Sequence, residues 1–168
     1  MIMIDYYTLQ LTLIAIIYSQ VINIFESMVW AGGLWRLKAP FRTCNELPKQ
    51  DMYHLVLMIA YALPFIPISR LITSWVLPSW IVWLLNDLLW HFWSVNPKYW
   101  IDWIKFYFNP KKKYVIWYAR MGLFYIGVTP RLMFYITLFR IILLPLIYYI
   151  STSIEIAGFF NQLIFSFL

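Results

Sequence analysis

The chain has 168 residues, of which 63% are hydrophobic and 12% are charged, and its formal net charge is +6. Thirteen Lys and Arg with seven Asp and Glu are too few to cover the surface of a soluble protein of this size. The composition therefore excludes a soluble domain. It predicts a single all-α membrane domain over 1–168, with about five transmembrane helices and one helix on the membrane surface.

The first membrane span is expected over 6–25. This stretch has twenty residues without a charge between Asp5 and Glu26. At about 1.5 Å rise per residue it is long enough to cross a hydrocarbon core of about 30 Å. The residues before it lack a basic start, and those near Phe25 lack a small-residue cleavage site, so the segment is expected to be retained and not removed as a signal peptide.

A basic loop over 26–52 separates this span from two further expected spans, 53–69 and 71–95. The loop contains four basic residues and two prolines, which argue against one continuous helix: Arg36, Lys38, Arg42, Lys49, Pro40 and Pro48. The second span is short and contains Pro64 and Pro67. The third has twenty-five residues, so it can cross with a tilt or a kink, and it is interrupted by Pro78, Asp87 and His91.

An amphipathic helix on the membrane surface is predicted over 96–109, with Asn96 as its cap and Pro97 at its first position. Its polar residues recur at helical spacing: Lys98, Asp102, Lys105 and Asn109. The remaining positions are largely apolar or aromatic: Trp100, Ile101, Trp103, Ile104 and Phe108. Aromatic rings of this kind are typical of the headgroup boundary.

The last two spans are expected over 114–129 and 132–152. The basic loops 26–52 and 96–113 should lie on one side of the membrane, because positive residues favour the matrix or cytoplasmic side. Two crossings between these loops satisfy that rule, and they place the N-terminus on the opposite side.

Charged residues within the expected spans need a partner or a purpose, because each costs about 2.5–3.5 kcal/mol at the bilayer centre. Asp87 and Arg120 fall at similar depths of about 10–12 Å on neighbouring antiparallel spans, so the sequence predicts an ion pair between them. Arg140 is expected to meet a carboxylate of a partner, a backbone carbonyl or a lipid phosphate. An alternative interpretation of Asp87 with His91 and nearby tryptophans is a proton or quinone site.

The two histidines leave an electron-transfer function open. His54 and His91 fall near the same ends of their expected spans, which would allow two histidines to hold a haem. This pattern resembles the anchor subunits of succinate dehydrogenase, small three-span proteins that share haem and quinone between chains. The resemblance implies a haem or quinone as cofactor, although the quinone-site residues of that family have no match here. The sequence shows no metal-binding motif.

A third alternative concerns the C-terminal run. Ile154-Glu155-Ile156-Ala157 followed by Gln162 resembles the last helix of mitochondrial ATP synthase subunit a. The resemblance covers about a tenth of the chain and implies a proton path through Glu155 and Gln162. That family also needs an Arg in a particular motif, and no Arg of this chain has that context.

The basic run Lys111, Lys112 and Lys113 is expected to bind anionic phospholipid such as cardiolipin. Nucleic acid is not expected as a partner, because the basic residues flank spans and do not form a soluble basic face. The bias toward Ile, Phe, Tyr and Trp resembles that of proteins encoded in protist mitochondrial genomes. A single cysteine, Cys44, excludes an internal disulfide.

Together these features predict a structural, non-catalytic membrane subunit of an energy-converting complex of the respiratory-chain type. Its expected place is the inner mitochondrial membrane, and its expected partners are other membrane subunits. It would support assembly and help to shape a lipid or quinone cavity, with no catalytic residue, metal or obligatory cofactor of its own.

Overall fold

A computed structural model describes residues 6–39, 41, 43, 44, 46, 47, 51–69 and 73–153. The described part is mostly helical, as predicted. Its five α-helices are α1 (Tyr6–Trp30), α2 (Tyr53–Ala62), α3 (Val76–Ser94), α4 (Trp100–Tyr107) and α5 (Pro130–Ser153). A 3-10 turn, η1 (Pro97–Tyr99), precedes α4, and strands β1 (Trp117–Met121) and β2 (Phe124–Val128) precede α5.

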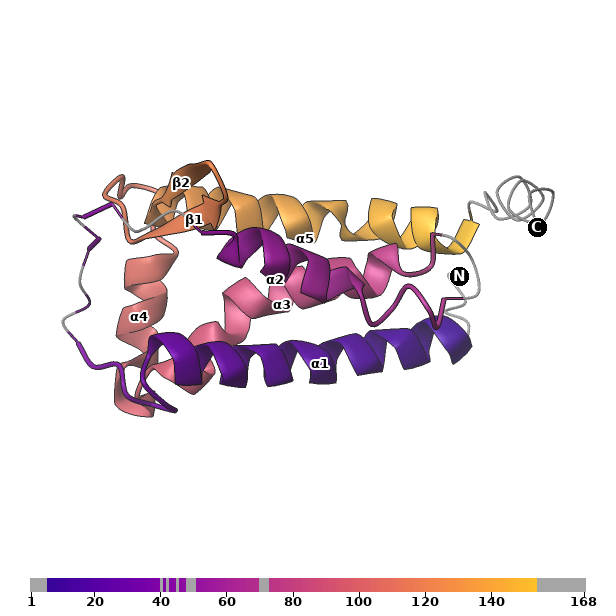
Figure 1. Cartoon of the computed structure of the whole chain (residues 1–168), viewed down its shortest axis with the longest axis horizontal. Helices are drawn as coiled ribbons and strands as arrows, with labels where there is room; N and C mark the ends of the chain where they lie inside the picture. The colour runs from indigo at the N-terminus through magenta and orange to yellow at the C-terminus, as the bar shows by residue number, and fades with distance from the viewer. Residues whose placement is uncertain are drawn as a thin grey trace.

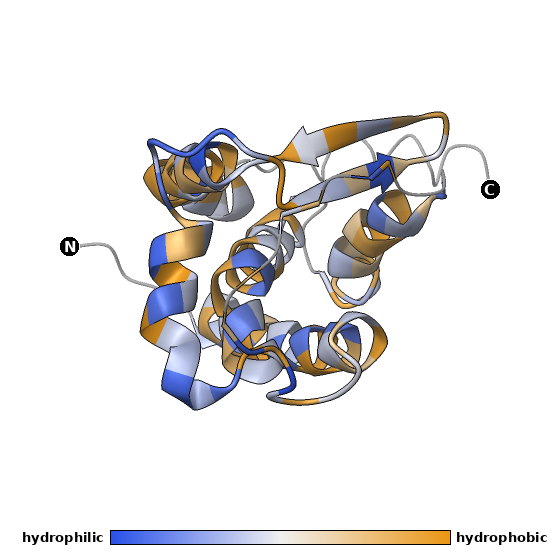
Figure 2. Cartoon of the chain, turned by 90° about the vertical axis from the view of Figure 1, so that its left-hand side faces the viewer, coloured by the Kyte–Doolittle hydropathy of each residue, from blue (hydrophilic) through white to orange (hydrophobic). Residues whose placement is uncertain are grey.

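The helices form an elongated bundle, in which α1 and α5 run along opposite long edges and α2 and α3 lie between them (Figure 1). The shorter elements α4, β1 and β2 gather at one end, and α4 lies across the direction of the long helices. We call this the α4 end. Figure 2 looks at it directly and shows hydrophilic and hydrophobic residues alternating along α4.

Two of the described helices, α1 and α5, are long and apolar enough to cross a membrane. The second predicted span is not supported, because α2 has ten residues, or about 15 Å, and gives way to turns that contain Pro64 and Pro67. The third predicted span corresponds to α3, which has nineteen residues and packs between its neighbours. Five transmembrane helices are therefore not supported.

The predicted span 114–129 is wrong, because this segment folds as an antiparallel β-hairpin in which Met121 pairs with Phe124. Two residues connect the strands, and the first, Gly122, has a φ of 73°. Glycine at this position is typical of the tight turns that match the twist of a hairpin. Aromatic and β-branched residues favour a strand as much as they favour a membrane span, so hydropathy alone did not separate the two.

The helix predicted over 96–109 is present as η1 and α4, and its position on a membrane surface stays a prediction. The side-chain oxygen of Asn96 accepts a hydrogen bond from the backbone N–H of Lys98 at 3.1 Å, as expected of a cap. Trp103 and Tyr107 are buried, whereas Ile101 and Ile104 are exposed. The apolar side of α4 is thus divided between the protein core and the outer surface.

The described part of the chain has two hydrophobic cores. The first lies where α1, α2 and α3 meet and contains Leu11, Ala15, Ile22, Tyr61, Phe65 and Val82. The second lies at the α4 end and joins Val95, Trp103, Tyr107, Val128 and Met133. The segment after α1 is tied to the second core, because the backbone of Leu37 exchanges hydrogen bonds with Ser94 and Asn96 at 3.0 and 2.9 Å. The hairpin and α4 therefore close one end of the bundle.

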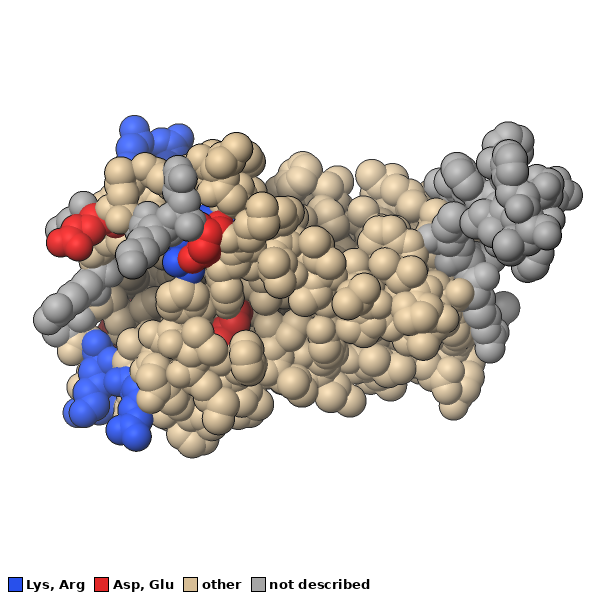
Figure 3. Space-filling view, in the orientation of Figure 1, with Lys and Arg blue, Asp and Glu red and all other residues tan. Residues whose placement is uncertain are grey.

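Charged side chains also gather at the α4 end. In Figure 3 the visible lysines and arginines lie at that end, while the middle of the visible face is almost free of charge. Described basic residues of both predicted loops belong to this end, among them Arg36 and Lys38 after α1 and Lys111 to Lys113 after α4. The molecule thus has a charged end and a largely uncharged body.

Candidate functional site: a buried polar network and two ion pairs

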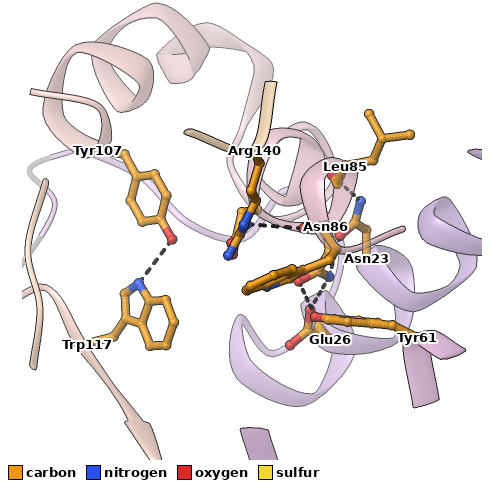
Figure 4. Close-up of polar contacts among 10 residues, drawn as sticks. Asn23, Glu26, Tyr61, Leu85, Asn86, Tyr107, Trp117 and Arg140 are labelled. Atoms are coloured by element: carbon orange, nitrogen blue, oxygen red, sulfur yellow. Dashed lines mark hydrogen bonds and ion pairs between the residues drawn. The ribbon is translucent and has the colours of Figure 1, made fainter. Parts of the chain in front are cut away.

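A network of buried polar side chains joins α1, α2 and α3 (Figure 4). At its centre, the Asn86 amide on α3 donates to Asn23 Oδ1 at 2.8 Å and to Glu26 Oε2 at 2.6 Å. The Asn86 oxygen accepts from the Tyr61 hydroxyl at 2.7 Å. The other oxygen of Glu26 accepts from the hydroxyl of Tyr53, at the start of α2. One amide on α3 therefore connects all three helices.

The side of α1 that faces α3 carries small and polar residues at intervals of four. Ala15, Ser19, Asn23 and Ser27 follow one another at this spacing, and each is fully buried. Residues four apart lie on one face of a helix, and small residues let two helix backbones come close. The hydroxyls of Ser27 and Ser94 are 2.6 Å apart across this interface. This repeat was the sequence signal that could have predicted the network.

An ion pair joins α3 to α5. Arg140 Nη1 binds Asp87 Oδ2 and also lies 3.4 Å from the backbone oxygen of Trp83. The guanidinium carbon is 3.7 Å from the centre of the Trp83 ring, a cation–π contact. The Trp80 indole N–H donates to the backbone oxygen of Arg140 at 3.0 Å. Of the three contacts expected for Arg140, the backbone carbonyl is present at Trp83, and the carboxylate belongs to Asp87 of this chain and not to a partner.

The predicted ion pair between Asp87 and Arg120 is not formed. Arg120 lies on β1 and pairs with Asp51, with 2.6 Å between Nη1 and Oδ2. Its guanidinium also lies over the rings of Trp30 and Tyr53, at 4.7 and 5.6 Å from their centres. The predicted pairing assumed that 114–129 was a helix antiparallel to α3. Because this segment is a hairpin, α5 is the antiparallel neighbour of α3 and supplies Arg140 instead.

The two histidines have separate surroundings. His54 Nδ1 accepts the backbone N–H of Arg120 at 3.0 Å, and its ring stacks on Trp117 with 4.9 Å between centres. Burial, assisted by the charge of Arg120, lowers the pKa of His54 from 6.5 to about 4. His91 lies in the last turns of α3 and is 3% exposed. Within the described ranges, no group of three His, Cys, Asp or Glu side chains is placed to hold a metal.

The predicted lipid-binding lysines, Lys111 to Lys113, are exposed in the turn after α4. The backbone N–H of Arg131 donates to the backbone oxygen of Lys112 at 3.1 Å, which brings the start of α5 beside them. Arg131 is also exposed. These four residues form a basic patch at the α4 end. The predicted proton path through Glu155 and Gln162 lies outside the described residues.

Two hollows on the bundle have almost entirely apolar walls. One, of about 280 Å³, is lined by Gln20, Trp35, Phe92, Trp93, Pro97 and Trp100. The other, of about 160 Å³, is bordered by Tyr61, Trp80 and Trp83 beside the polar network. Such walls are suited to an acyl or isoprenoid chain more than to a polar substrate.

No family model, curated protein or solved structure matches the chain.

Proposed function

We propose that this chain is a structural membrane subunit of a multi-subunit energy-converting complex, of the respiratory-chain type in an inner mitochondrial membrane. The observation that carries the proposal is the position of the exposed apolar residues on the two helices long enough to cross a membrane. On α1 they include Leu13, Ile17, Val21 and Phe25, and on α5 they include Leu138, Phe139, Ile142 and Leu146.

These two helices lie at opposite edges of the bundle, so each presents a separate apolar face (Figure 1). Large exposed apolar surfaces mark contacts with lipid or with other proteins. Asn23 and Arg140, two polar residues of the same helices, are buried and hydrogen-bonded within the bundle. This arrangement suits a chain that contacts other membrane subunits and lipid on two sides.

The basic patch Lys111–Lys113 with Arg131 supports the same proposal. Positive residues at the α4 end would lie at the matrix or cytoplasmic surface, where they would hold anionic phospholipid such as cardiolipin. The choice of a mitochondrial host is supported by the amino-acid composition, which resembles that of proteins encoded in protist mitochondrial genomes.

Native-gel separation of gently solubilised source membranes tests this function, with mass spectrometry and a visible spectrum of the band that contains the chain. We expect the chain to migrate with the subunits of an energy-converting complex, and the band to show no haem beyond that of its known subunits. Migration as a small species alone would contradict the subunit proposal. Additional haem would instead favour the electron-transfer alternative with His54 or His91.

A further inference from the structure

Three buried polar side chains, one on α3 and two on α5, carry atoms without a hydrogen-bond partner among the described residues. The atoms are Oγ1 of Thr137, Nε of Arg140 and one ring nitrogen of His91, whose other ring nitrogen lies within hydrogen-bond reach of the backbone oxygen of Leu88. The side chains belong to residues that are 7%, 4% and 3% exposed, respectively. Buried polar groups in folded proteins are almost always paired, so three such groups require an explanation.

Helical spacing around the ion pair places these groups near one another. Asp87 contacts Arg140 across the interface, and α3 and α5 run antiparallel (Figure 1). His91 follows Asp87 by four residues, and Thr137 precedes Arg140 by three. Because the helices are antiparallel, His91 and Thr137 are both displaced from the ion pair toward the α4 end. The displacement along the helix axis is about 6 Å for His91 and about 4.5 Å for Thr137. Spacings of three and four also keep each on the face that carries its half of the ion pair.

The chemistry of the three groups defines the ligand that they fit. Arg140 Nε is a donor only, and the Thr137 hydroxyl both donates and accepts. The neutral imidazole of His91 offers its acceptor nitrogen, because its N–H faces the backbone oxygen of Leu88. The charge of Arg140 is already matched by Asp87, so the site has no excess charge to attract an ion. Exposed fractions below one tenth leave little access for a larger molecule. A water molecule meets these demands, because it donates and accepts and bonds to two to four polar groups.

We propose that α3 and α5 enclose a buried water-binding site, in which His91, Thr137 and the Nε–H of Arg140 bind water beside the Asp87–Arg140 ion pair. This site would make part of the bundle interior polar and exchangeable with solvent. It would also give the buried imidazole a partner for proton exchange. The proposal does not depend on the identity of the host complex.

The variant Thr137→Val tests the site, with Thr152→Val as the matched control on the same helix. Thr152 donates its hydroxyl to the backbone oxygen of Tyr148 at 2.8 Å and needs no water. In purified full-length protein, Thr137→Val should lower the melting temperature more than Thr152→Val, because it removes one of the groups that bind the water. A melting temperature that is unchanged or raised would overturn the proposal, since replacing an unpaired buried hydroxyl by a methyl group is favourable.

Nitrogen-15 NMR of the histidine rings provides a second measurement. The chain has two histidines, and His91→Phe identifies the signals of His91 by their loss. We expect the ring nitrogens of His91 to show hydrogen-bonded chemical shifts and an exchange peak with water, and Thr137→Val to shift them. An unbonded chemical shift at the acceptor nitrogen, or hydrogen-bonded shifts without transfer to water, would overturn the proposal.

Discussion

The two interfaces of α3 are built on different chemistry. Toward α1, the contacts use small and neutral groups, such as the hydroxyl pair of Ser27 and Ser94 and the amides of Asn23 and Asn86, around a single carboxyl group. Toward α5, the contacts depend on the ion pair of Asp87 with Arg140, and several polar atoms nearby have no partner among the described residues.

This difference separates two ways of placing polar groups inside an apolar bundle. A hydrogen-bonded network of many members loses part of its stability when one is removed, because the others keep some partners. A buried ion pair behaves differently, since removal of one partner leaves a full charge unpaired. The α3–α5 interface should therefore be more sensitive to single substitutions than the α1–α3 interface.

The largest effect is expected from Asp87→Leu. It leaves the guanidinium of Arg140 buried without a carboxylate, and it should lower the free energy of unfolding by about 3–5 kcal/mol. The double variant Asp87→Leu with Arg140→Leu should recover most of this loss, because it removes both charges. Thermal unfolding in one detergent measures both variants. A double variant as unstable as the single one would show that the pair does not dominate this interface.

A smaller effect is expected from Asn86→Leu on the other face of α3. The change removes three hydrogen bonds, to Asn23, Glu26 and Tyr61, and should cost about 2–3 kcal/mol of unfolding free energy. Gln10→Leu, at an exposed position of α1, is the control and should have little effect. An equal loss from both variants would argue against a stabilising network.

The pH dependence of stability tests the position of His54. The pKa of His54 is about 4 in the folded chain, whereas an unperturbed histidine, as in the unfolded chain, has a pKa of 6.5. The unfolded chain therefore takes up a proton first as the pH falls. Stability should decrease between about pH 6.5 and 4, by about 1 kcal/mol for a half-buried ring. His54→Gln should flatten this part of the curve in thermal unfolding. An unchanged curve would show that His54 is not the group responsible.

The smallest effect is expected from Asp51→Asn. Asp51 pairs with Arg120, but its side chain is 41% exposed, so the pair is screened by solvent. The expected loss is below about 1 kcal/mol, because Arg120 keeps its contacts with Trp30 and Tyr53. A loss as large as that of Asp87→Leu would contradict the contrast between a buried and an exposed pair.

The sequence predicted the long helices well because their signal is local. A charge-free stretch from Tyr6 predicts a helix, and α1 begins there and continues to Trp30. The signal for the cap at Asn96 is also local, because it consists of Asn96 and the neighbouring Pro97. By contrast, Glu26 was assigned to a loop because it is charged, whereas in the structure it is buried and hydrogen-bonded within the last turns of α1. Its partners, Tyr53 and Asn86, are distant in sequence and could not be identified from spacing.

The hairpin and the ion pairs were not predicted from local sequence signals. The pairing of Asp87 followed from an assumed helix at 114–129, so one wrong element produced one wrong partner. The glycine between Met121 and Leu123 was a turn signal that hydropathy outweighed. Which arginine meets Asp87 depends on which helix is antiparallel to α3, and this is a property of the whole bundle.

The proposal of a membrane subunit with one charged end is tested most directly by cysteine labelling, with an impermeant maleimide in sealed vesicles of one orientation. Single cysteines would be placed at Lys112, at the α4 end, and at Pro67, at the opposite end, in a chain with Cys44→Ser. We expect Lys112→Cys and Pro67→Cys to react from opposite sides of the membrane. Reaction of both from the same side, or release of the chain from membranes by alkaline carbonate, would contradict a bundle that crosses the bilayer.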